Sequence, residues 1–185
     1  MRKVIFLLSA LPLAPCAAEM PDYVSASREA VAEFSTVLKS ELESAMKAGG
    51  PVNAIQVCQL KAPGIAAAVS KARGLRIART SLKLRNPANA PDAWERAVLD
   101  RFQQQATDGA DLSALEHYEV VETDGRKTFR YMKAIPTQGV CLNCHGGQIA
   151  PEVRAVLDRL YPNDQARGFK PGDLRGAFTV VRALP

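Results

Sequence analysis

Histidine and metal-ligand pairs are scarce in this chain. Of its 185 residues only two are histidines, His117 and His145, and only four are cysteines. A closed zinc site needs four ligands, and a second Cys/His pair at metal-ligand spacing is missing, so the sequence argues against structural zinc. Internal repeats and low-complexity tracts are missing as well. The composition therefore predicts an ordinary globular domain.

A strong excess of one charge and long apolar runs are also lacking. The formal net charge is +5, of which Arg2 and Lys3 supply two, and so mild an excess does not indicate nucleic acid as a partner. Beyond the first residues no stretch is long and apolar enough for a transmembrane helix, which needs about 20 residues. We therefore predict that the mature protein is soluble, with no membrane span.

Residues 1–18 have the pattern of a secretory signal peptide. The basic pair Arg2-Lys3 precedes a largely apolar run of ten residues, and small residues follow up to Ala18. We predict cleavage after Ala18, a single domain over 19–185 and export to the periplasm. Lipid attachment at Cys16 is the alternative, but the proline directly before this thiol fits it poorly.

The most informative segment is Cys141-Leu142-Asn143-Cys144-His145, because Cys-x-x-Cys-His is the attachment signature of a c-type haem. On a helical turn the two thiols and the imidazole share one face. Thioether bonds from Cys141 and Cys144 would then hold the porphyrin while His145 binds the iron. The alternatives are a structural disulfide, a thioredoxin-like redox pair and half of a zinc site. A redox pair needs no histidine in the last position, so we predict one covalently attached haem c as the cofactor.

Apolar spacing predicts helices followed by antiparallel strands. Helical periodicity covers 27–47, 52–62, a segment that starts near Pro91, and a short segment from Pro151 to Pro162. The first two helices are predicted to stop at Gly49-Gly50 and at Pro63-Gly64. Strand patterns cover 118–123, 128–135, 177–184 and, more weakly, 75–80, with a hairpin turn at Asp124-Gly125. This order predicts an α+β domain rather than an all-helical cytochrome.

Few residues could bind the iron opposite His145. The candidates for this sixth ligand are Cys58, His117, Met46 and Met132, and an open position is a further alternative. The methionines lie at predicted core positions, where methionine usually fills space. Cys58 shares a helical stripe with apolar residues, which predicts that it faces inward and could be a small core residue. Near ferric iron, however, a thiol loses its proton and becomes an anionic donor.

Several blocks of the sequence together resemble a family of PAS-like c-type haem domains, found alone or as sensor modules. In chain order the blocks are Cys58 with Ala62-Pro63, Arg79-Thr80-Ser81, Arg85 to Glu95, Cys141 to Gly146, and Tyr161-Pro162 through Gly176. The resemblance implies thioether bonds at Cys141 and Cys144, with His145 as the proximal ligand and Cys58 as the distal ligand. It also implies a PAS-like antiparallel sheet flanked by helices, behind long N-terminal helices.

Two arginines, Arg79 and Arg85, are candidates for contact with the haem propionates. A guanidinium group near a propionate would neutralise charge that is buried with the cofactor. The alternative for the basic residues of this region is a solvated surface.

The ligand set that the resemblance implies favours sensing over catalysis. An anionic thiolate stabilises ferric iron, so Cys58/His145 ligation implies a low reduction potential. With both axial positions filled, we predict that the protein is not an enzyme but a redox or gas sensor, with a diatomic gas as ligand and a separate signalling protein as partner. One alternative is a soluble electron carrier with fixed ligands, which docks a redox partner protein. The other is a small haem peroxidase or reductase opened by ligand loss.

Overall fold

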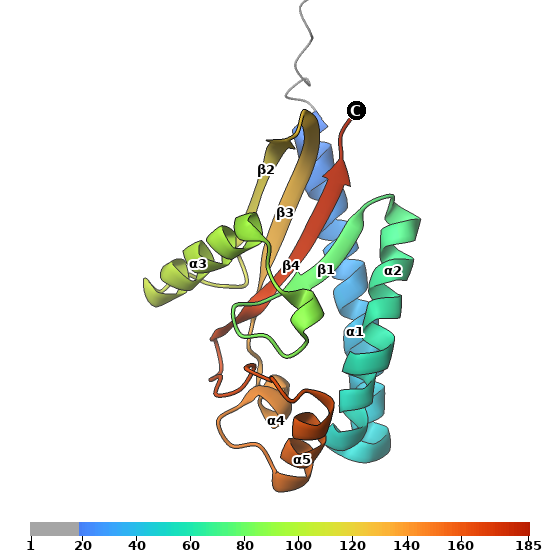
Figure 1. Cartoon of the computed structure of the whole chain (residues 1–185), viewed down its shortest axis with the longest axis vertical. Coiled ribbons are helices and arrows are strands. Elements are labelled where there is room, and N and C mark those ends of the chain that lie inside the picture. The colour runs from blue at the N-terminus through green and yellow to red at the C-terminus, as the bar shows by residue number, and fades with distance from the viewer. Residues whose placement is uncertain (1–18) are drawn as a thin grey trace, which may run out of the picture.

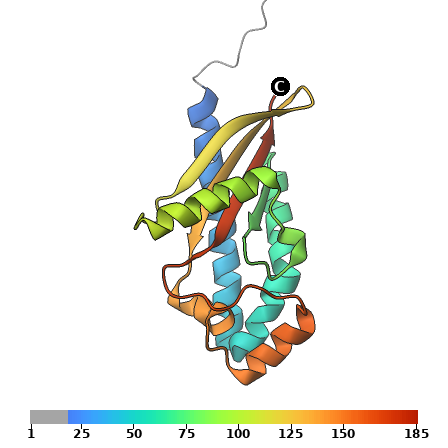
Figure 2. The same cartoon turned by 60° about the vertical axis from the view of Figure 1, so that its left-hand side comes forward.

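A helical hairpin covers one face of a four-stranded antiparallel sheet in the computed structural model, and a third helix crosses the other face (Figures 1 and 2). The elements in chain order are α1 (Glu19–Gln56), η1 (Val57–Lys61), α2 (Ala62–Arg73), β1 (Arg76–Thr80), η2 (Pro87–Asn89), α3 (Ala93–Thr107), β2 (Glu116–Thr123), β3 (Arg126–Pro136), η3 (Gly139–Cys141), α4 (Leu142–His145), α5 (Pro151–Leu160) and β4 (Leu174–Ala183). The structure describes residues 19–185, so the predicted signal peptide lies outside the described residues. The α+β fold class is confirmed, while the PAS-like description of the sheet stays a prediction.

The hairpin consists of two helical arms that meet at Gly49-Gly50. Gly50 has a φ of 66°, a left-handed conformation that glycine adopts without steric cost. Arg73, near the end of the second arm, forms an ion pair with Glu29 of the first arm, so the arms run antiparallel. The predicted stop of the first helix is therefore confirmed.

The second arm is longer than the sequence predicts. Instead of ending at Pro63-Gly64, the helix continues through the π-helical turn η1 into α2 and ends at Gly74, which caps it with a φ of 62°. Pro63 lies in the first turn of α2, directly after the wider π-turn, where its missing N–H group costs little. The predicted end of this helix is therefore wrong.

The sheet has the strand order β1-β4-β3-β2, and all neighbouring strands are antiparallel. Asp124 and Gly125 join β2 to β3 with φ values of 51° and 70°, as a type I′ turn requires, so the predicted hairpin is confirmed. The predicted strands at 75–80 and 177–184 correspond to β1 and β4. A Cβ atom at Gly176 of β4 would collide with the carbonyl oxygen of Thr80, so the close approach of these strands requires glycine.

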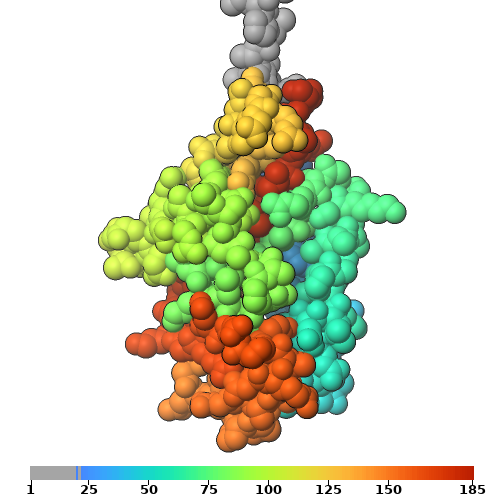
Figure 3. Space-filling model, in the orientation of Figure 1, coloured from blue at the N-terminus to red at the C-terminus, as the bar shows by residue number. Residues whose placement is uncertain are grey.

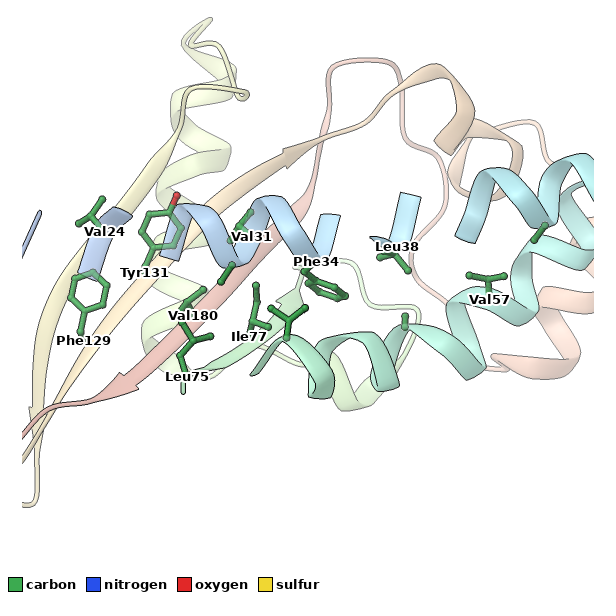
Figure 4. Packing of buried hydrophobic residues seen from close by; sticks show 14 of the residues in the cluster. Val24, Val31, Phe34, Leu38, Val57, Leu75, Ile77, Phe129, Tyr131 and Val180 are labelled. Carbon is green, nitrogen blue, oxygen red and sulfur yellow. The ribbon is translucent and has the colours of Figure 1, made fainter. Parts of the chain in front are cut away.

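The two faces of the sheet carry separate hydrophobic cores. Phe129 and Tyr131 of β3 point toward α1 and α2, where they join a cluster that includes Phe34 (Figure 4). Met132, the next residue along the strand, points to the opposite face and shares a core with Phe102 of α3. This alternation follows from the two-residue period of a strand.

The end of the molecule that holds α4 and α5 has a small core of its own. We call this part, residues 139–173 and the helix around Ile55, the α4–α5 end. There Ile55 packs against Val153 and Leu157 of α5. Figure 3 shows residues of this segment gathered at the lower end of the molecule, beside the turn of the helical hairpin. Within the described part of the chain, no helix is both long enough and apolar enough to cross a bilayer.

Candidate functional site

The Cys-x-x-Cys-His motif forms a short helix at the α4–α5 end. Cys141 closes η3, and Leu142–His145 make up the single turn α4. Gly146 follows and donates its N–H group to the carbonyl of Leu142 at 3.0 Å, while a Cβ atom at this position would lie 2.7 Å from the same oxygen. Glycine is therefore required where the chain leaves the motif. Both cysteines of the motif are free thiols.

The imidazole of His145 is held in one tautomer. Its Nδ1 atom lies 2.8 Å from the carbonyl oxygen of Ala166, and because a carbonyl only accepts, Nδ1 carries the proton and donates it. The ring of Phe169 stands edge-on to the imidazole, with centroids 6.2 Å apart. Burial, together with the charges of Arg175 and Arg85, lowers the pKa of His145 to about 3. The side chain is therefore neutral and keeps its Nε2 lone pair, which is the state that a metal-binding histidine requires.

The segment 164–169 braces the motif from the other side. The N–H group of Phe169 donates to the carbonyl of His145 at 3.0 Å. Asp164, whose side chain is fully buried, accepts a hydrogen bond of 2.9 Å from the N–H group of Ala166. This bond shapes the turn that presents the Ala166 carbonyl to the imidazole.

Arg85 links the motif to this segment. Its Nη2 group donates to the carbonyl of Cys144 at 2.5 Å, to Oδ2 of Asp164 at 3.0 Å and to the carbonyl of Ala166 at 3.2 Å. Burial raises the pKa of Asp164, but hydrogen bonds from Arg85 and Arg167 outweigh it and hold this pKa below its usual value. Asp164 is therefore ionised, and Arg85 uses its Nη2 hydrogens on protein groups.

Cys58 does not face inward as its helical stripe predicts. Ile55 and Ala62, which lie on the same predicted stripe, are buried, whereas Cys58 is exposed. The cause is η1, because a π-turn holds one extra residue and rotates the side chains within it away from their α-helical positions. The prediction that this thiol is buried is therefore wrong.

The exposed thiol of Cys58 nevertheless lies beside the motif. Burial raises the pKa of Cys144, the positive charge of Arg85 opposes this rise, and an electrostatic interaction with Cys58 adds to it. Burial likewise raises the pKa of Tyr161, again with a contribution from Cys58. Arg79 also interacts electrostatically with this thiol. The fold thus brings Cys58 within electrostatic reach of Cys144, although the two residues are far apart in the sequence.

Two guanidinium groups near the motif have no carboxylate partner. Within residues 19–185, neither Arg79 nor Arg175 forms an ion pair. Arg79 lies over the ring of Phe34 at 5.8 Å, and Arg175 lies over the ring of Phe169 at 5.3 Å. Burial and the charges of Arg85 and Arg79 lower the pKa of Arg175 to about 10. The site therefore holds two positive charges that protein carboxylates in this range do not neutralise.

The site residues that the sequence predicts lie either at the α4–α5 end or on segments that interact with it. They are Cys58, Arg79, Arg85, Cys141, Cys144 and His145. Sequence reasoning did not single out Arg175 or Asp164, although both belong to the last block of the resemblance. No local pattern identifies them, because their partners Ser81 and Arg85 lie far away in the chain.

The other candidate ligands pack against other partners than the motif. His117 is on β2, where its ring packs against Trp94 with centroids 5.8 Å apart and contacts Arg101. Met132 is fully buried beneath α3. Met46 lies close to the turn of the helical hairpin, where it packs against the hydrophobic cluster of the two arms. Of the four candidates, the described residues place Cys58 alone beside the motif.

Comparison with known proteins identifies the family. The family model described as Tll0287-like matches residues 17–182, which is most of the chain. The chain belongs to the Tll0287-like family.

A solved structure supports the same relationship. The crystal structure of the cyanobacterial heme-protein Tll0287 is 25% identical in sequence and superimposes with a TM-score of 0.63. The match covers 92% of this chain and 96% of that chain. A comparison with the curated proteins gave no match. This likeness to Tll0287 therefore includes the sheet, the helical hairpin and the α4–α5 end alike.

Proposed function

We propose that this member of the Tll0287-like family is a periplasmic c-type cytochrome that carries one haem c. Cys141 and Cys144 would attach the group through thioether bonds, and His145 and Cys58 would be the axial ligands. The likeness to a cyanobacterial heme-protein supports haem binding, and the Cys-x-x-Cys-His motif supports covalent attachment. Such a group supplies one-electron redox chemistry and, where an iron position opens, binding of diatomic gases.

The hydrogen bond from His145 Nδ1 to the carbonyl of Ala166 is the observation that carries this proposal. Metal-bound histidines donate their second ring N–H group to a carbonyl or carboxylate, which fixes the tautomer and the ring orientation. His145 makes this bond at 2.8 Å, and its low pKa means that no proton has to leave before Nε2 binds a metal. A disulfide or a dithiol redox pair would not need this arrangement.

The position of Cys58 supports a thiolate as the second axial ligand. Its side chain is exposed and lies beside Cys144, so it is available to a group attached to the motif. Thiolate stabilises ferric iron more than methionine does, so the centre would have a low reduction potential.

Arg79 and Arg175 are the better candidates for contact with the two propionates. Both guanidinium groups lack a carboxylate partner within 19–185, whereas Arg85 is paired with Asp164. Two carboxylates placed there would neutralise two half-buried positive charges, which are costly when unpaired. We therefore assign the propionates to Arg79 and Arg175 and give Arg85 a different role.

The π-turn that holds Cys58 favours a sensing role over catalysis. π-Turns are strained insertions that are frequent at functional sites, and removal of the extra residue from the turn rotates the residues that follow it. Protonation or release of Cys58 on reduction would therefore alter η1 and α2, and a separate signalling protein would detect this change. A diatomic gas could occupy the position that Cys58 leaves.

A soluble electron carrier with fixed ligands is the second candidate. It is favoured by the brace around His145, which involves Arg85, Asp164 and the backbone of 164–169. A rigid proximal side limits the rearrangement that accompanies electron transfer. In this case a redox partner protein would dock at the α4–α5 end.

Expression in a host that matures c-type cytochromes tests the attachment. We expect an intact mass equal to the polypeptide plus one haem, and a coloured protein. A variant with both Cys141→Ser and Cys144→Ser should lack the covalent group, whereas the matched Cys58→Ser variant should keep it. A colourless wild-type protein with the mass of the bare polypeptide would contradict the proposed function.

Absorption spectra of the oxidised and reduced protein, with and without carbon monoxide, separate the roles. Carbon monoxide binding only after reduction supports the sensor. Low-spin bands that stay unchanged in both states support the carrier. Turnover of added peroxide would instead indicate a peroxidase.

A further inference from the structure

We propose that Arg85, held by Asp164, controls how strongly His145 donates to the iron, and thereby raises the reduction potential of the centre. Arg85 is in this view a positioning residue that acts through the carbonyl of Ala166. The inference rests on the proposed function, because it requires that His145 is an axial ligand.

The carbonyl oxygen of Ala166 accepts hydrogen bonds from two side chains. One donor is His145 Nδ1 at 2.8 Å, and the other is Arg85 Nη2 at 3.2 Å. The positively charged donor withdraws electron density from the shared oxygen, so the oxygen accepts less strongly from the imidazole. His145 then keeps its Nδ1 proton more fully, has less imidazolate character and is a weaker donor. A weaker donor stabilises ferric iron less.

Asp164 limits this effect of Arg85. Its fully buried carboxylate lies 3.0 Å from the same Nη2 atom that contacts the Ala166 carbonyl. In such a buried pair each charge offsets the field of the other at neighbouring groups. The iron site would therefore experience only the part of the Arg85 charge that Asp164 does not offset. Removal of Arg85 should lower the reduction potential, and removal of the Asp164 charge should raise it.

The Nε atom of Arg85 indicates that the side chain is not placed to form the largest number of hydrogen bonds. Its Nε group is buried and has no hydrogen-bond partner among residues 19–185, which costs free energy. The guanidinium is placed so that one nitrogen serves Cys144, Asp164 and Ala166 together. This geometry couples the ion pair to the backbone of Cys144 and, through the Ala166 carbonyl, to the imidazole of His145.

The midpoint potential of the holoprotein tests the inference. We expect Arg85→Gln to lower the midpoint potential by at least about 59 mV. For one electron this shift corresponds to a tenfold change in the ferrous-to-ferric ratio at the same applied potential. We expect Asp164→Asn to raise it, because the amide still accepts from the Ala166 N–H group but no longer offsets Arg85. Arg85→Lys, which keeps the charge, should fall between Arg85→Gln and the wild type.

Two charge changes on exposed residues serve as controls. Arg154→Gln on α5 and Asp100→Asn on α3 remove one charge of the same sign each, and among residues 19–185 neither side chain forms a hydrogen bond or ion pair with the site. Both should leave the potential close to that of the wild type. A shift of the His145 Nδ1 proton resonance to higher frequency in reduced Arg85→Gln would show the strengthened hydrogen bond directly.

Potentials that move in the same direction in Arg85→Gln and Asp164→Asn would overturn the inference, because loosening of the motif alone predicts this result. Unchanged potentials would overturn it as well. If Arg85→Gln does not accumulate as holoprotein, Asp164→Asn decides: a rise supports the inference, and a fall or no change contradicts it. A wild-type protein without covalent haem would instead refute the proposed function itself.

Discussion

At the scale of single residues, the chemistry of the site depends on side chains that keep one donor atom free to bind a metal. His145 is an example, because the bond from its Nδ1 to Ala166 leaves Nε2 as its single remaining nitrogen. Cys58 is another, since its thiol is exposed beside Cys144 and outside the core. Substitution of the exposed Cys58 would remove the proposed ligand without opening a cavity, so its effect on spectra can be separated from its effect on folding.

We predict that Cys58→Ala raises the midpoint potential of the holoprotein by more than about 59 mV, a tenfold change in the redox ratio. The reason is the loss of an anionic donor that stabilises ferric iron. Redox titration followed by absorption measures this shift. Cys58→Ser is the matched control for size, and it should also alter the low-spin spectrum. An unaltered spectrum in both variants would eliminate the distal thiolate.

The buried side chain of Tyr131, far from the motif, belongs to a hydrogen-bonded network that stabilises the fold. It donates to Glu116 at 2.9 Å, and Glu116 is also bound by Arg28. The Arg28 hydrogen bond, together with the one from Tyr131, outweighs burial and holds the pKa of Glu116 below its usual 4.5. We expect Tyr131→Phe to lower the free energy of unfolding at neutral pH by about 1.5 kcal/mol, as measured in urea.

The pH dependence of this network has a definite sign. Because the folded-state pKa of Glu116 is depressed, its contribution to stability is present above pH 4.5 and is lost as the pH falls through the folded value. The stability difference between wild type and Tyr131→Phe should therefore narrow in acid. A difference that grows as the pH falls would contradict the assigned hydrogen bond from Tyr131 to the ionised Glu116.

At the scale of elements, the π-turn η1 decides where the thiol of the second helical arm points. An α-helix advances 100° per residue, so one extra residue changes which side chains share a face. Ile55 before the turn and Ala62 after it are both buried, and Cys58 inside it is exposed. The π-turn thus lets the second helical arm keep Ile55 and Ala62 buried while the thiol of Cys58 points away from the core.

Deletion of Leu60 tests this role of η1. Leu60 is 71% exposed, so its removal should restore an α-helical turn at little cost in buried apolar area. We expect helical content by circular dichroism to stay close to that of the wild type, while the absorption spectrum becomes like that of Cys58→Ala. Leu60→Ala is the control and should keep the wild-type spectrum. A deletion variant that keeps it too would show that the π-turn does not position Cys58.

At the scale of the whole molecule, the two cores on the sheet are separate from the α4–α5 end. The clusters around Phe129 and Met132 contain no residue of 139–173, and the small cluster of α5 rests on Ile55 of the hairpin. The sheet can therefore form its cores without the motif. The α4–α5 end has less buried apolar surface of its own and gains more from an attached group.

This separation predicts local rather than global loss of order in the apoprotein. In the Cys141→Ser/Cys144→Ser variant, amides of 139–173 should exchange with deuterium much faster than in the holoprotein. Amides of β3 should exchange at nearly the same rate in both forms, because the sheet cores are unchanged. Hydrogen exchange followed by mass spectrometry measures both regions in one experiment. Equal loss of protection across β3 and 139–173 would contradict this division.

Local patterns were enough to predict most elements and the motif. The helix predicted to start near Pro91 corresponds to α3, which begins at Ala93 behind a reciprocal capping box of Asp92 and Glu95. The hairpin at Asp124-Gly125 and the α4 turn are likewise encoded by adjacent residues. Such features depend on interactions within a few positions of the chain, so a single sequence reveals them.

The rest of the site depends on contacts between distant segments. Arg85 and Asp164 are 79 positions apart, and no periodicity announces that they will pair. The apolar spacing around Cys58 is that of an α-helix and does not reveal the π-turn η1. Arg175 likewise contacts Ser81, 94 positions away. Pro63 lies within a continuing helix because it follows the π-turn directly.

The C-terminal end of β4 lies next to the β2–β3 hairpin, at the opposite end of the molecule from α4 and α5 (Figure 1). An electrode attached through a tag at Pro185 would therefore hold the motif on the outer side of the protein film. The rate of electron tunnelling falls steeply with distance. Voltammetry in this orientation would therefore give a low electron-transfer rate constant even if the centre exchanges electrons rapidly with a docked partner. Attachment through an engineered cysteine at Glu152, an exposed residue in the first turn of α5, would turn the motif toward the metal surface.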